Sequence, residues 1–210
     1  MGVFEFMIQN REEVFRLTLE HLALVAVAML IAVLIGVPLG IVLARRAALR
    51  HWVLGAANVV QTVPSLALFG FLIPVPLIGG IGSRTAIVAL ALYALLPIIR
   101  NTYIGISGVD PAVMEAARGM GMTARQTLWQ VQMPLATGVI LAGIRVATVI
   151  AVGVATIAAA IGAGGLGMYI FRGVAMVSNP VILAGAIPAA LLAVLADVSL
   201  GWAERRLAPK

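Results

Sequence analysis

The chain has 210 residues, of which 62% are hydrophobic and 10% are charged, with a formal net charge of +6 and no cysteine. Soluble globular domains carry about 25% charged residues, so this composition excludes an ordinary water-soluble fold and indicates a membrane protein. The missing cysteine excludes disulfides, thiolate metal sites and thiol nucleophiles.

Five apolar segments are each long enough to cross a membrane as a helix, which predicts an all-α integral membrane protein with one domain over residues 1–210. The spans are expected at residues 19–44, 52–78, 85–107, 134–161 and 179–202. Pro64 interrupts the second span, and Pro134 is expected to open the fourth. Gly36 and Gly40 in the first span are four residues apart, a spacing that predicts close approach of another helix.

Arginine and lysine are distributed unequally between the two sides of this arrangement. The segments after spans one, three and five carry Arg45, Arg46, Arg50, Arg118, Arg125, Arg205, Arg206 and Lys210. The opposite side carries Arg11, Arg16, Arg84 and Arg172. The positive-inside rule therefore predicts a multi-pass protein of the cytoplasmic (inner) membrane with the N-terminus outside and the C-terminus cytoplasmic. Because these charges are dispersed between apolar spans, they do not indicate nucleic acid binding.

Residues 110–134 form a polar interruption on the predicted cytoplasmic side. Asp110 followed by Pro111 is a typical helix start, and Thr123 with Gln126 has the form of a capping box, so the pattern predicts helix, turn and helix. Five apolar residues at roughly helical spacing are expected to form one docking face: Ala117, Met120, Ala124, Leu128 and Val131. An amphipathic helix lying on the membrane is the alternative from the residues alone.

The stretch also carries a fixed motif: "EAA" at 115–117, a glycine at 121, and "MP" at 133–134. It resembles the EAA signature of ABC importer permeases. Three further stretches, "QTVPSLALFGFLIP" from 61, "LYALLPIIRNTYIGISGVDPAVMEAARGMGM" from 92 and "IGAGGLG" from 161, are similar to the glycine betaine, carnitine and choline branch of that family.

This resemblance implies a type I importer permease, the membrane subunit of a transporter and not itself an enzyme. It implies no cofactor on this chain, with ATP and Mg on separate cytoplasmic ATPase subunits. The other implied partners are an extracellular solute-binding protein and a second permease chain, in a homo- or heterodimer within the lipid bilayer. By the same resemblance, residues 110–134 are a coupling loop that docks into the ATPase. The implied coupling residues are Glu115, Ala116, Ala117, Gly121 and Pro134.

A glycine-rich segment follows the fourth span and formally fits G-x-G-x-x-G. A dinucleotide site is rejected because a membrane span precedes the segment and no acidic residue follows at the required distance. By resemblance it is an outer loop near a gate or a docked binding protein, and a plain connecting turn is the alternative. Its glycines are Gly162, Gly164, Gly165 and Gly167.

Arg145 lies well inside the fourth predicted span, and Asp197 lies in the fifth. Charges at such depth face the bundle interior or water, so we hypothesise an ion pair between these two side chains. The alternative is that Arg145 binds backbone carbonyls or lines the translocation path. His21 and His51 are each expected at a membrane interface, and no constellation of metal ligands is apparent.

The expected function is permeation of compatible solutes such as glycine betaine, choline or carnitine. A methionine-type amino-acid permease is the alternative within the family. An intramembrane enzyme is disfavoured because catalytic groups are lacking, and a secondary transporter because five spans do not divide into two repeats. Aromatic faces bind quaternary ammonium groups, but no single residue is assigned among Phe69, Phe71, Tyr93, Tyr103 and Tyr169.

Overall fold

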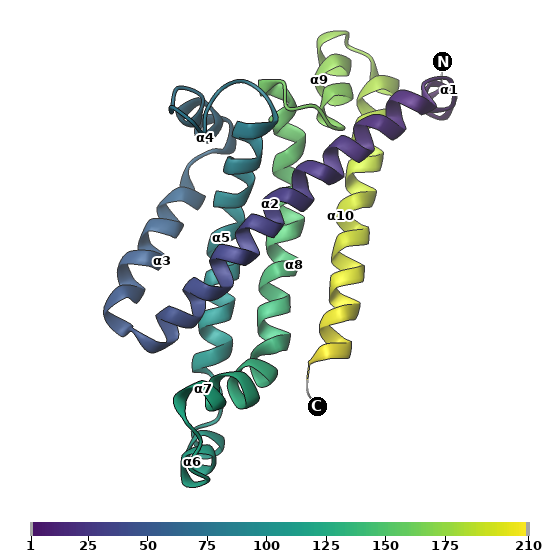
Figure 1. Cartoon of the computed structure of the whole chain (residues 1–210). Coiled ribbons are helices and arrows are strands. Elements are labelled where there is room, and N and C mark those ends of the chain that lie inside the picture. Colours follow the sequence, from purple (N-terminus) through teal and green to yellow (C-terminus); the bar gives the residue numbers. More distant parts are fainter. Residues whose placement is uncertain (1, 209–210) are drawn as a thin grey trace.

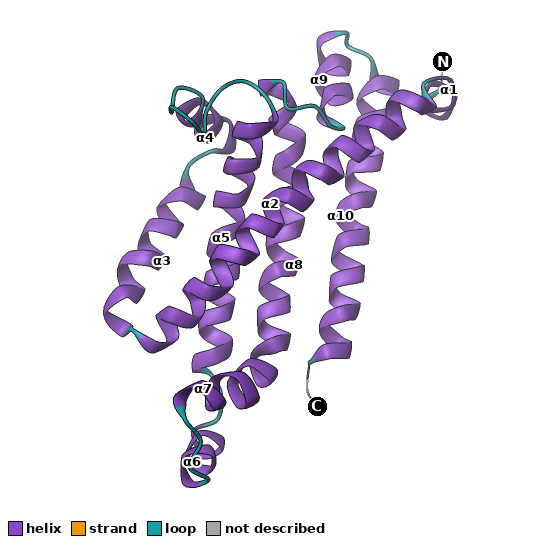
Figure 2. Ribbon diagram, in the orientation of Figure 1, coloured by secondary structure: helices purple, strands orange, loops and turns teal. Residues whose placement is uncertain are grey.

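The computed structural model describes residues 2–208 as a bundle of long helices with short helices at both ends (Figure 1). The elements are α1 (Val3–Gln9), α2 (Arg11–Arg45), α3 (Ala47–Thr62), α4 (Ser65–Leu72), α5 (Ser83–Ser107), α6 (Pro111–Gly119), α7 (Ala124–Gln126), a π-helical segment (Thr127–Gln132), α8 (Met133–Ala158), a short 3₁₀ turn (Ala159–Ile161), α9 (Gly167–Ala175) and α10 (Asn179–Leu207). Within the described residues no strand occurs (Figure 2). The predicted all-α class is confirmed.

Four helices are long and apolar enough to cross a membrane: α2, α5, the continuous helix Ala124–Ile161, and α10. The pair α3 and α4 supplies the fifth span if it is counted as one, although its two parts are bent by 104°. The bend follows Thr62, because Pro64 has no N–H to continue the helical hydrogen bonds. The hydroxyl of Tyr93 donates to the carbonyl of Val63 at this break.

The fourth span does not begin at Pro134, as the sequence predicted. Instead α7, the π-helical segment and α8 form one helix of 38 residues. The N–H of Met133 donates to the carbonyl of Leu128, five residues earlier. Pro134 has no N–H, and in a regular α-helix its ring would clash with the carbonyl four residues earlier. The wider π-helical turns before Pro134 change the hydrogen-bond pattern there, and the helix continues without a break.

Helix α5 lies at the centre of the bundle, between α2 and α8. The predicted close approach at Gly36 and Gly40 is confirmed: a methyl group at Gly36 would lie 2.8 Å from Ile98, and one at Gly40 would lie 2.5 Å from Thr102. These glycines let the α2 backbone lie directly on the side chains of α5. On another side of α5, Gly143 of α8 approaches Asn101 in the same way.

The bundle has two distinct ends (Figure 1). Helix α6 lies at one end of the bundle, toward which the C-terminal end of α10 also points, and we call this the loop end. Helices α1, α4 and α9 lie at the opposite end. The sequence assigned two groups of basic residues to opposite sides of the membrane, and their arginines lie at opposite ends of the bundle. Lys210 lies outside the described residues.

Candidate functional site

The 110–134 loop lies at the loop end, where α6 leads through a turn into α7, the first turn of the continuous helix Ala124–Ile161. The Asp110 carboxylate accepts a hydrogen bond from the N–H of Ala112 at 2.8 Å, with Pro111 in the first helical turn. Thr123 and Gln126 form the reciprocal capping box, in which the N–H of Thr123 donates to Gln126 Oε1 at 2.8 Å. Both predicted caps are confirmed.

The turn between these helices depends on Gly121, whose φ of +74° lies in the left-handed region. Glu115 and Ala116 are exposed on α6, whereas the side chain of Ala117 is 1% exposed and packs within its own chain. The prediction of one continuous docking face is wrong, because Met120 is 74% exposed while Leu128 is buried. The left-handed turn breaks the helical periodicity on which that prediction relied.

Two side chains connect the 110–134 loop to the membrane-spanning helices. The guanidinium of Arg45, at the end of α2, donates to the carbonyl of Ala124 at 3.0 Å. The amide of Gln132 donates to the carbonyl of Ile106 in α5 at 3.3 Å. These contacts join residues distant in sequence, and neither was expected from the sequence. They connect the loop to helices α2 and α5 as well as to α8.

The structure brings Arg145 of α8 and Asp197 of α10 together. Arg145 donates through Nε to Asp197 Oδ1 at 2.6 Å and through Nη2 to Asp197 Oδ2 at 2.9 Å, and its Nη1 lies 3.4 Å from Glu204 Oε2. Gly201 lies between the two acids in the sequence, and the guanidinium of Arg145 packs against its backbone. A methyl group at Gly201 would lie 3.1 Å from Arg145 Nη1. Glu204 and Gly201 were missed, although seven residues separate Asp197 from Glu204 and place them on one helical face.

Reversing the charges tests whether this contact joins α8 to α10. Arg145→Asp and Asp197→Arg are each expected to lower the amount of folded chain in the membrane, because each leaves like charges facing one another. The double variant is expected to recover part of the loss. Fluorescence-detected size-exclusion chromatography of the solubilised chain measures it, and a double variant no better than either single one would contradict a paired role.

The glycine segment 162–167 forms a loop at the opposite end of the bundle. Gly162, Gly164 and Gly165 have φ values of +73°, +83° and +79°. The N–H of Gly165 donates to Glu20 Oε2 at 3.1 Å, and a methyl group on Gly164 would lie 2.5 Å from the same oxygen. Gly167 instead begins α9, where a methyl group would overlap the carbonyl of Thr156. The glycines therefore let this loop fold onto a carboxylate of α2.

A second contact joins α9 to α2 nearby. The buried Tyr169 donates its hydroxyl to Glu13 Oε2 at 2.9 Å, and Arg172 Nη2 lies 3.5 Å from Glu13 Oε1. Burial, followed by the hydrogen bond to Glu13, raises the pKa of Tyr169 to about 12. The phenol is thus held neutral as a hydrogen-bond donor.

The raised pKa sets the pH range in which this contact stabilises the protein. Because the folded pKa of Tyr169 exceeds the unfolded value of 10.0, its contribution is fully present below pH 10.0 and lost as pH rises through about 12. Tyr169→Phe is expected to cost about 1.5–3 kcal/mol near neutral pH, the range for a hydrogen bond to a charged group. Thermal unfolding at several pH values checks this, and a difference that grew toward pH 12 would contradict it.

His21 of α2 is fully buried within the bundle. Its Nε2 lies 3.2 Å from the carbonyl of Val152. The glycine loop covers its other side, since a methyl group on Gly165 would lie 3.2 Å from Nδ1. Across residues 2–208, no three His, Asp or Glu side chains are grouped so that they could hold a metal ion.

Known proteins share both the sequence and the fold of this chain. Residues 36–209 match the family described as "Binding-protein-dependent transport system inner membrane component". The carnitine transport permease protein OpuCD of Listeria monocytogenes is 50% identical over 190 residues, which are 90% of this chain and 84% of that protein. The osmoprotectant import permease protein OsmW of Salmonella typhimurium is 45% identical over 212 residues, covering 100% and 99%.

A solved structure of the MetNI methionine ABC transporter in an inward-facing conformation matches 97% of this chain and 98% of its own, with a TM-score of 0.83 and 25% identity. The two chains therefore share one fold over nearly their full lengths. The chain belongs to the family of inner membrane components of binding-protein-dependent transport systems.

Proposed function

We propose that this chain is the membrane subunit of an ATP-driven importer of compatible solutes such as glycine betaine, carnitine and choline. The observation that carries the proposal is the 45–50% identity to permeases named for carnitine and osmoprotectant import, over nearly their full lengths. A methionine-type importer is less well supported, because the MetNI chain shares the fold at only 25% identity.

In this proposal ATP is hydrolysed on separate subunits that dock at the loop end. Glu115 and Ala116 are exposed there for contact, Gly121 shapes the turn, and buried Ala117 supports the helix from within. Pro134 belongs to the helix that leads away from the loop. The contacts of Arg45 and Gln132 connect movement of the docked loop to α2 and α5. Because arginines are concentrated at the loop end, this end is cytoplasmic and the N-terminus lies outside.

The opposite end then faces the solute-binding protein. The 162–167 loop lies there, held by Glu20, and a change in that contact can accompany opening of the bundle to the outside. A second permease chain completes the pathway between two bundles. Arg145 and Asp197 keep α8 and α10 together while the bundle moves.

The experiment is purification from the native membrane followed by uptake in vesicles with labelled glycine betaine, carnitine, choline and methionine. An ATPase subunit is expected to co-purify. Uptake of the first three solutes is expected to require ATP on the cytoplasmic side of the membrane. Methionine serves as the comparison for the amino-acid alternative. Uptake that proceeds without ATP, or in the absence of any ATPase subunit, would refute the proposal.

A further inference from the structure

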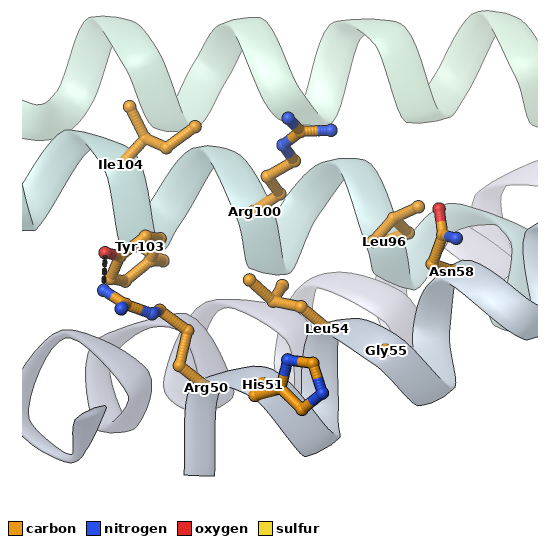
Figure 3. Close-up of a pocket in the computed structure, with 9 residues that line it drawn as sticks. All are labelled: Arg50, His51, Leu54, Gly55, Asn58, Leu96, Arg100, Tyr103 and Ile104. Carbon is orange, nitrogen blue, oxygen red and sulfur yellow. Dashed lines mark hydrogen bonds between the residues drawn. The ribbon is translucent and has the colours of Figure 1, made fainter. Parts of the chain in front are cut away.

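A cavity of about 560 Å³ opens between α3 and α5, within the size range of small-molecule sites (Figure 3). Its polar lining includes Arg50 and Asn58 from α3 and Arg100 and Tyr103 from α5, and no acidic residue lines it. Leu54 and Leu96 supply apolar surface between these groups. The cavity therefore presents positive charge without a compensating negative side chain.

The two arginines are held differently. Arg50 donates to the hydroxyl of Tyr103 at 2.5 Å, and its guanidinium lies 5.4 Å from the centre of the Tyr103 ring. One face of the ring is thereby taken up by a cation of the protein itself. Arg100 forms no ion pair or side-chain hydrogen bond with any other residue of the described chain. Its donors are available for an anionic group.

Position on α5 explains why Arg100 can remain charged. It lies seven residues before Ser107, or about 10 Å from the end of the span, and its side chain does not extend toward Tyr103 and Ile104, which lie nearer that end (Figure 3). Other sides of α5 carry α2, at Ile98 and Thr102, and α8, at Asn101. An arginine at this depth faces water or protein and not hydrocarbon. The third side of α5 therefore borders the α3–α5 cavity and not lipid.

Guanidinium groups bind carboxylates with directed, charge-assisted hydrogen bonds and repel cations. We propose that the α3–α5 cavity is a passage site for solutes that carry a carboxylate, with Arg100 as its anchor and Arg50 as the second donor. This inference rests on the proposed function and narrows its substrate class. Zwitterions such as glycine betaine and carnitine offer a carboxylate to Arg100, whereas choline, a cation without a carboxylate, offers none, so choline uptake gains nothing from this arginine.

The phosphate of a lipid headgroup shares the chemistry of a carboxylate, and basic clefts at the cytoplasmic ends of membrane helices can bind such headgroups. Two observations favour a solute over a lipid headgroup. The side chain of Arg100 does not point toward the nearer end of α5, and Asn58 lines the cavity farther from that end, along α3. A lipid would also act on transport of every solute alike. A bound solute and a bound lipid headgroup therefore predict different effects of an Arg100 substitution on the uptake of individual solutes.

The test uses the complete transporter with its ATPase and binding protein in liposomes, at saturating binding protein. Arg100→Gln is expected to lower the initial rate of glycine betaine uptake about tenfold, the effect of losing one charge-assisted hydrogen bond. Arg100→Lys is expected to recover part of the rate because it keeps the charge. Choline uptake and basal ATP hydrolysis are expected to stay unchanged. Arg46→Gln is the matched control, because Arg46 is exposed nearby but does not line the cavity.

Three results would overturn the inference. The first is an Arg100→Gln variant that carries glycine betaine at the wild-type rate. The second is an equal loss for glycine betaine and choline, or a loss that depends on anionic lipid in the liposomes, either of which would assign the arginine to structure or to a headgroup. The third is a wild type that imports choline but not glycine betaine. A wild type that imports none of these solutes would instead refute the proposed function.

Discussion

Replacing Gly121 by valine is expected to abolish ATP-driven uptake while leaving the chain inserted in the membrane. Gly121 has a φ of +74°, which a β-branched residue adopts at a cost of about 1–3 kcal/mol. The turn would relax to a negative φ and move α6, with Glu115, away from its present direction relative to α7. The spans themselves do not contact Gly121, because nothing lies within 4 Å of a methyl group placed there.

Gly119→Ala is the matched control, because Gly119 ends α6 with open space around it and no positive φ. It is expected to keep uptake near the wild-type rate. Uptake and ATP hydrolysis are measured together in vesicles, with immunoblotting of the membrane fraction to establish equal amounts of protein. ATP-driven uptake by Gly121→Val at the wild-type rate would refute a docking role for the loop.

Gly40→Ala is expected to destabilise the bundle more than Gly36→Ala, the other glycine replacement in α2. The added carbon would lie 2.5 Å from Thr102 Cβ and 2.9 Å from the carbonyl oxygen of Ile99, and the latter is backbone that cannot rotate away. Overpacking of this kind costs about 1–3 kcal/mol. For a chain of this size, that corresponds to a fall in melting temperature of roughly 2–12 °C.

Gly153→Ala in α8 adds the same methyl group where nothing lies within 4 Å, so it isolates the effect of the contact. Alanine favours the helix more than glycine, by about 1 kcal/mol, so this control is expected to melt no lower than the wild type. Thermal unfolding of the detergent-solubilised chain measures both variants. Equal melting temperatures for the two would show that α2 and α5 can separate without cost.

Local chemistry explains which features could be predicted. The spans follow from long apolar runs, the caps from Asp110 and Thr123, and the close helix contact from Gly36 and Gly40, because each depends on residues near one another in sequence. The ion pair of Arg145 could be anticipated only because charges within a membrane span face protein or water and are commonly paired.

Other features depend on three-dimensional arrangement. The contact of Arg45 with Ala124 joins residues 79 positions apart, and no periodicity encodes it. The cavity around Arg100 arises from two helices whose facing sides the sequence does not specify. The π-helical turns before Pro134 are not predicted by the sequence, because a proline more commonly stands at the start of a helix.

The continuous helix Ala124–Ile161 gives the molecule a lever. Its 38 residues extend about 55 Å at the rise of an α-helix, from the exposed loop to the glycines that contact Glu20. Pivoting such a rod by about 10° at one tip carries the other tip through about 10 Å, wider than the diameter of a small solute. A flexible break at Pro134 would let the two parts of the helix move independently. The π-helical turns keep the helix continuous, so that movement at one end is transmitted to the other.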